Sequence, residues 1–351
     1  MPAEFWTEAA RMTTSGLLVA AVAVPVALVA RAVRPREPFL PRWKPWPVPW
    51  NGFELMVVFL IVAFIVPPLV HQLLSTGGFY SAVYGDTLPA PRAKDAAPDA
   101  LKSANTLRML WASVFALPLQ LGALWFALRA RYPAWIPQLV GYGSSAGKVV
   151  LAVVAWLVLT PLVLSLHAGV NAISQGQGAQ PETHALAQLV GRPALDQAVL
   201  MFEACVGAPL REELLIRGLL LAWCVGRMRV PGAGVAPLTA ARPWLVMLVA
   251  VALAASSEKR APVIFAGVLV AGLAVLWRFK RTGARRARAV YATAALFGLM
   301  HPTWPTPIPL FVLGLALGWL AVRTNGLIVP VLVHALFNAV SAVFVLRSGA
   351  G

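Results

Sequence analysis

Three short polar segments stand inside long apolar stretches of this chain, and their residue types could together carry out hydrolysis. They are Arg211–Arg217, Phe297–His301 and His334–Asn338. A carboxylate can take a proton from water, and a nearby imidazole can share that water. A second imidazole and a carboxamide can donate hydrogen bonds to a developing oxyanion. This set of groups suits the attack of water on an amide, and the HExxH signature of soluble metalloproteases is absent.

The composition places these polar groups in a membrane. Of the 351 residues, 59% are hydrophobic and only 12% are charged, whereas a soluble domain carries about 25% charged residues. We therefore predict an all-α, polytopic transmembrane bundle of about 8–10 spans, with the polar site inside the membrane in the C-terminal half. The net charge of +16 lies mostly in short loops between apolar runs. The expected partner is the lipid bilayer, and nucleic-acid binding is not expected.

The apolar runs set the expected organisation of the chain. Spans are predicted near residues 14–31, 52–74, 106–128, 148–169, 196–226, 243–256, 261–277, 288–302, 307–322 and 326–346. We divide the chain into an N-terminal membrane region of about four spans, 1–190, with loops 31–51 and 75–105, and a site-bearing region, 195–346. Lys and Arg are concentrated in alternate loops, which places 31–48 and 278–288 in the cytoplasm and both termini outside.

Helix geometry brings the three segments to a similar depth. Glu212, His301 and Asn338 each lie about 20 Å along a helix from a basic residue expected at the cytoplasmic side. Three helices that carry polar groups to one depth favour a shared site. Within the first segment, Glu213 and Arg217 share a helix face and can form an ion pair. Glu212 then points about 100° away from Glu213, toward a different partner.

The segments resemble a known family of intramembrane endopeptidases, the CAAX-protease and bacteriocin-processing (CPBP or Abi) family, which includes the type II CAAX prenyl proteases. The family pattern is EExxxR, then FxxxH, then HxxxN or HxxxD, on separate membrane helices. All three motifs are complete and in order here, and the resemblance covers roughly 195–346. They read Glu212-Glu213-Leu-Leu-Ile-Arg217, Phe297-Gly-Leu-Met-His301 and His334-Ala-Leu-Phe-Asn338.

The resemblance implies a role for each matching residue. Glu212 and His301 would activate the water, and His334 and Asn338 would stabilise the oxyanion. Supporting roles would fall to the remaining motif residues, Glu213, Arg217 and Phe297. The substrate would be a membrane-associated peptide or protein, with a prenylated CAAX-like tail as one candidate, and the expected location is a bacterial inner (plasma) membrane.

The resemblance leaves open whether the hydrolysis depends on a metal ion. The endopeptidase could be glutamate-dependent or a metallo-endopeptidase, because the family is often labelled metalloprotease. Glu212, His301 and His334 are the candidate ligands of a zinc ion. The glutamate-and-water mechanism does not require that metal, so no cofactor is assigned.

The same residues permit other interpretations. The polar set could form interhelical hydrogen bonds that hold a bundle together, or a proton relay in a proton-coupled transporter. It could also persist in a catalytically silent scaffold or immunity protein. A structural ion pair is as good a reading of Glu213 and Arg217 as direct chemistry, and Phe297 reads as a packing residue. Arg211 could extend to the interface or pair locally, and Glu203 could face a cavity or an unrecognised partner.

Overall fold

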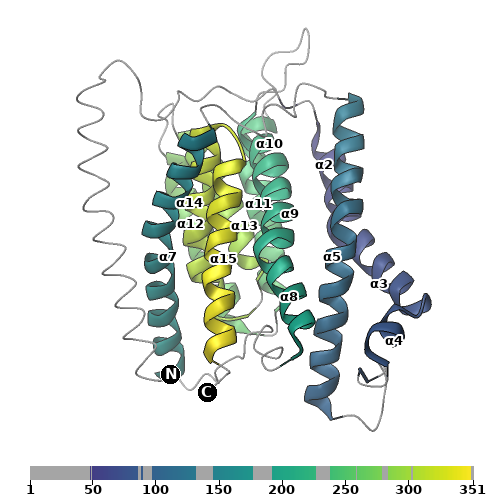
Figure 1. Ribbon diagram of the computed structural model, residues 1–351. Coiled ribbons are helices and arrows are strands. Elements are labelled where there is room, and N and C mark those ends of the chain that lie inside the picture. The colour runs from purple at the N-terminus through teal and green to yellow at the C-terminus, as the bar shows by residue number, and fades with distance from the viewer. Residues whose placement is uncertain are drawn as a thin grey trace. The chain divides into compact units, whose positions relative to one another are not determined.

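The protein is helical throughout the residues that the structure describes. The computed structural model describes residues 48, 50–85, 88–89, 97–131, 145–176, 192–226, 238–257, 259–278, 284–301 and 303–348. Every regular element within these ranges is a helix (Figure 1). This confirms the predicted all-α fold. The predicted span at 14–31 lies outside the described residues.

The helices follow the predicted spans closely. In chain order they are α2 (Gly52–Phe59), η1 (Leu60–Ile65), α3 (Val66–Thr76), α4 (Phe79–Tyr84), α5 (Pro98–Arg131), α7 (Ser145–Gly176), α8 (Ala194–Phe202), η4 (Glu203–Gly207), α9 (Ala208–Glu212), η5 (Glu213–Leu221), α10 (Ala222–Val225), α11 (Leu238–Ala255), α12 (Arg260–Arg278), α13 (Ala284–Leu299), α14 (Pro307–Thr324) and α15 (Ile328–Ser348). The elements η1, η4 and η5 are π-helical. The sequence pattern did not predict these wider turns.

Length and hydropathy support a multi-pass membrane protein. Within the described residues, five helices are long and apolar enough to cross a bilayer. They are Gly52–Thr76, Ala100–Phe126, Ala146–Gln175, Arg260–Arg278 and Pro307–Thr324. Large apolar side chains stand exposed on such helices, including Phe64 at 67% and Phe126 at 77%. Exposed apolar surface of this kind suits contact with lipid rather than water.

Two compact units are interleaved along the chain. The first contains residues 1–50, 136–182 and 213–334, and the second contains 51–135, 183–212 and 335–351. The boundaries fall between Glu212 and Glu213 and between His334 and Ala335, so two of the three polar segments contribute to both units. The predicted division of the chain at about residue 190 stays a prediction. The assignment of the loops to the two sides of the membrane also stays a prediction.

The first unit is built around α13. This helix packs against α11, α12, α14 and η5, and Figure 1 shows α11 to α14 running beside one another. Small residues allow α13 and α14 to approach closely, because a Cβ added at Gly314 of α14 would come within 3.1 Å of the Ala294 Cα of α13. Such small-residue contacts are typical of membrane helix packing. They fix the position of Phe297, near the end of α13.

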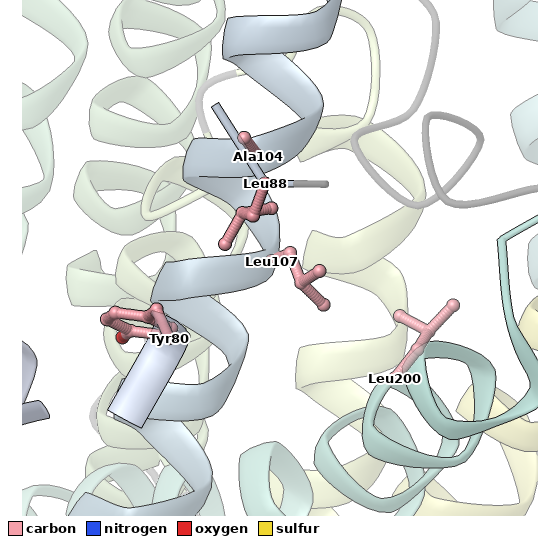
Figure 2. Close-up of a cluster of buried hydrophobic side chains, with 5 residues drawn as sticks. All are labelled: Tyr80, Leu88, Ala104, Leu107 and Leu200. Carbon is pink, nitrogen blue, oxygen red and sulfur yellow. The ribbon is translucent and has the colours of Figure 1, made fainter. Parts of the chain in front are cut away.

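The second unit has its own apolar core. Figure 2 shows five of its buried side chains, which come from α4, α5, α8 and the segment that follows α4: Tyr80, Leu88, Ala104, Leu107 and Leu200. Beside this core the Tyr84 hydroxyl donates to Oδ1 of buried Asp196 at 2.7 Å. Burial, and then that hydrogen bond, raises the pKa of Tyr84 to about 12. Tyr84 therefore stays a proton donor at neutral pH and links α4 to α8.

Candidate active site

A fully buried ion pair lies at the start of η5. Arg217 Nη1 donates to Glu213 Oε1 at 2.7 Å, and the two side chains are 1% and 0% exposed. This is the pair that their spacing predicted. Arg217 also lies 4.3 Å over the Phe297 ring and donates to the Gly314 carbonyl at 3.5 Å. A buried charge is costly unless it is paired and hydrogen-bonded, and these contacts meet that requirement for the guanidinium.

The same carboxylate holds His334. The His334 Nδ1 lies 3.0 Å from Glu213 Oε1, and both side chains are buried. A carboxylate that is paired with arginine accepts hydrogen bonds, so Nδ1 of His334 carries the hydrogen in this contact. The hydrogen bond made by one ring nitrogen sets the chemistry of the other. Glu213 thereby fixes the orientation of the His334 ring.

The Phe297 ring contacts one guanidinium and two imidazoles of this unit. Its ring lies edge-to-face with His301, with centroids 5.3 Å apart, and with His334 at 5.6 Å. Arg217 lies over the same ring. The Phe297 side chain is 1% exposed. The packing role predicted for Phe297 is thus a specific one, because a single ring sets the spacing between two imidazoles and a guanidinium.

His301 lies just beyond the end of α13 and is held by its own preceding turn. Its Nδ1 lies 2.8 Å from the Phe297 carbonyl oxygen. A carbonyl can only accept, so Nδ1 donates and Nε2 of the neutral ring is the acceptor nitrogen. The side chain is half-buried. His301 therefore has the tautomer that a proton acceptor needs, and partial access for water.

The remaining two proposed catalytic residues belong to the second unit. Glu212 is the last residue of α9 and is half-buried, in contrast to fully buried Glu213. Asn338, in α15, donates from Nδ2 to the Ala204 carbonyl of η4 at 2.8 Å. Each is described within its own unit. The gathering of Glu212 and Asn338 with His301 and His334 in one site stays a prediction.

The second unit also contains a buried polar cluster that the family motifs do not include. The Glu203 carboxylate forms an ion pair with Arg211 and accepts from Ser113 Oγ of α5 at 2.7 Å. Glu203 is 7% exposed. The local pairing considered for Arg211 is therefore present, and the unidentified partner of Glu203 is this arginine together with a serine. Glu203, an acidic residue inside an apolar run, was the sign of this cluster in the sequence. Ser113 lies 90 positions away from it, and no sequence pattern indicates its role.

The described side chains do not form a recognisable metal site. Among them, no group of three or more His, Cys, Asp or Glu residues could hold a metal ion. The Nδ1 of His334 is directed at a carboxylate that already faces a guanidinium. Such Nδ1 contacts leave Nε2 of His301 and of His334 able to bind a metal, so the zinc site considered for these two residues and Glu212 stays a prediction. Metal dependence stays a question for experiment.

Comparison with known proteins agrees with the motifs. Residues 194–340 match the family described as type II CAAX prenyl endopeptidase Rce1-like. The match begins at the first residue of α8 and ends within α15, so it contains all three polar segments. It confirms the predicted resemblance to CAAX-type intramembrane proteases at the level of the family. No curated protein and no solved structure matches the chain.

Proposed function

Because residues 194–340 are similar to type II CAAX prenyl endopeptidases, we propose that the protein is an intramembrane endopeptidase. Its substrate is a membrane-associated peptide or protein, and a prenylated CAAX-like tail is the first candidate to test. The observation that carries the proposal is the pair of anchored imidazoles around Phe297. Both His301 and His334 have Nδ1 directed at an oxygen acceptor, on the Phe297 carbonyl and on Glu213.

In the proposed reaction, Glu212 and His301 activate a water molecule. The water oxygen forms a bond to the scissile carbonyl carbon while its proton passes to the Glu212 carboxylate. The Nε2 atom of His301, set as an acceptor by the Nδ1 contact, orients the same water. The C–N bond then breaks, and the proton held by Glu212 is delivered to the leaving amine. Atoms and charges balance without a covalent enzyme intermediate.

His334 and Asn338 are assigned to the oxyanion. For His334 to donate from Nε2 while Nδ1 donates to Glu213, the ring must carry both protons. Glu213 lies against Nδ1 of that ring, and Arg217 holds Glu213 in place. Asn338 has a second amide hydrogen beyond the one given to Ala204. Preorganised donors of this kind are among the largest contributions to amide hydrolysis.

The proposal is tested by reconstituting the full chain in liposomes and adding an internally quenched, farnesylated peptide that ends in a free CAAX-type carboxylate. We expect cleavage after the lipidated cysteine, identified by mass spectrometry of both products. If an unlipidated apolar transmembrane peptide is cleaved instead, the proposed endopeptidase activity stands and the proposed substrate class is wrong. Proton flux into the same liposomes without cleavage of either peptide would contradict the proposal and favour a transporter.

A second prediction concerns metal. Wild-type protein treated with EDTA and then passed through metal-free buffer is expected to keep its cleavage rate, because the proposed mechanism activates water with Glu212 and His301 and uses no metal. The measurement is the initial rate with the quenched peptide before and after treatment, together with metal analysis of the purified protein. Loss of activity that returns on addition of zinc would show that the glutamate-and-water mechanism is wrong.

A further inference from the structure

The π-helical segment η4 has a hydrogen-bonding pattern that leaves one carbonyl without its main-chain donor. The Ala208 N–H donates to the Glu203 carbonyl, five residues earlier. In this register the next donor, residue 209, would bond to the Ala204 carbonyl. Residue 209 is proline, which has no N–H. The proline ring also clashes with the carbonyl four residues earlier in an α-helix, so Pro209 both favours the wider turn and frees the Ala204 oxygen.

The freed oxygen is the one that binds Asn338. The Asn338 Nδ2 donates to the Ala204 carbonyl at 2.8 Å. One amide hydrogen used in this way fixes the plane of the carboxamide, and the other hydrogen is left to donate elsewhere. We propose that Pro209 is a positioning residue, which acts through the Ala204 carbonyl to aim Asn338 at the oxyanion. This inference rests on the oxyanion role assigned to Asn338 in the proposed function.

The polar cluster described above holds the same turn in place. A Cβ added at Gly207 would collide with Glu203 Oε2, so the Glu203 carboxylate lies against its own turn. Arg211 and Ser113 bind the other carboxylate oxygen. Glu203 therefore anchors η4 to α9 and to α5. This gives a reason for burying a charged pair beside the turn on which Asn338 depends.

The activity test is a double-mutant cycle with the quenched farnesylated peptide. We expect Asn338→Ala to lower kcat by about 10²-fold, as removal of one oxyanion donor does. Pro209→Ala supplies the missing N–H and removes the ring, and we expect kcat to fall by about 10-fold while KM changes little. If Pro209 acts through Asn338, the double variant loses no more than Asn338→Ala alone. Losses that multiply, or a fully active Pro209→Ala protein, would overturn the inference.

A matched control separates positioning from general damage to a helix. Pro161 is also a buried proline inside a helix, in α7. Pro161→Ala makes the same chemical change away from η4 and is expected to keep the wild-type kcat. Thermal unfolding in detergent, measured for both variants, shows whether either has lost its fold. A kcat decrease of equal size in both variants would contradict a specific role for Pro209.

A spectroscopic measurement tests the inference even if no peptide is cleaved. The sequence contains only five asparagines, so selective 15N-asparagine labelling gives a simple set of side-chain NH2 signals, and Asn338→Ala identifies the one from Asn338. We expect Pro209→Ala to move that signal and Pro161→Ala to leave it unchanged. An Asn338 signal that stays in place in Pro209→Ala refutes the positioning role. Failure of wild-type cleavage with a moved signal would instead count against the proposed function alone.

Discussion

A Glu212→Gln variant is expected to fold like the wild type and to cleave the farnesylated peptide at least about 10³-fold more slowly, within the range for loss of a general base. The amide has almost the shape of the carboxylate but cannot take a proton from water. Glu212 is half-buried at the end of α9, and glutamine keeps an oxygen that can accept hydrogen bonds. The measurement is kcat at saturating peptide, with thermal unfolding as the check on folding.

The matched control for this variant is Glu54→Gln. Glu54 completes a capping box with Asn51 at the start of α2, and a capping box accepts either Glu or Gln at that position. The control therefore repeats the chemical change outside the candidate site and is expected to leave kcat unaltered. Undiminished cleavage by Glu212→Gln, together with inactivity of His301→Ala, would mean that His301 alone is the base.

Much of the architecture could be predicted because bilayer crossing imposes a simple pattern. Apolar runs of spanning length placed nine helical segments that the structure describes, including both sides of the short connection near residues 256–260. The Glu213–Arg217 ion pair followed from their spacing of four residues. The three motifs also indicated the family that residues 194–340 match. These features are local in sequence, so periodicity and spacing are sufficient to find them.

The features that sequence analysis missed depend on register or on distant partners. The π-helical turns change which carbonyl meets which donor, and apolar periodicity is too coarse to detect one extra residue per turn. Pro209 was the available sign for η4, because proline inside a helix must free a carbonyl. The contact between Glu213 and His334 joins residues 121 positions apart. Spacing showed that Glu213 could pair with Arg217, but not that the same oxygen also binds an imidazole.

Breaking the Glu213–Arg217 pair from one side is expected to have the largest effect on stability. In Arg217→Met the fully buried Glu213 carboxylate loses its arginine partner and keeps its contact with His334. In Glu213→Gln the guanidinium loses its charged partner and keeps its contacts with the Phe297 ring and the Gly314 carbonyl. Removing one member of a buried ion pair costs on the order of 3–5 kcal/mol. We expect each variant to show a clear fall in Tm in detergent and a lower yield of folded protein.

Replacing both members separates stability from catalysis. The double variant Glu213→Leu/Arg217→Met fills the space with apolar groups, and such replacements of buried ion pairs are often neutral or stabilising. We therefore expect its Tm to recover most of the single-variant loss. Its cleavage rate should stay on the order of 10²-fold below wild type, because His334 has lost the carboxylate that orients Nδ1.

Recovery of both stability and activity would show that Glu213 and Arg217 form a structural pair alone. In that case the function of His334 would not depend on Glu213, and the orienting role assigned to Glu213 would be wrong. Recovery of stability without activity instead gives Glu213 two separable functions, charge neutralisation of Arg217 and orientation of His334. Only the second of these is chemical, and it is the one that couples the fully buried glutamate of the first polar segment to the histidine of the third.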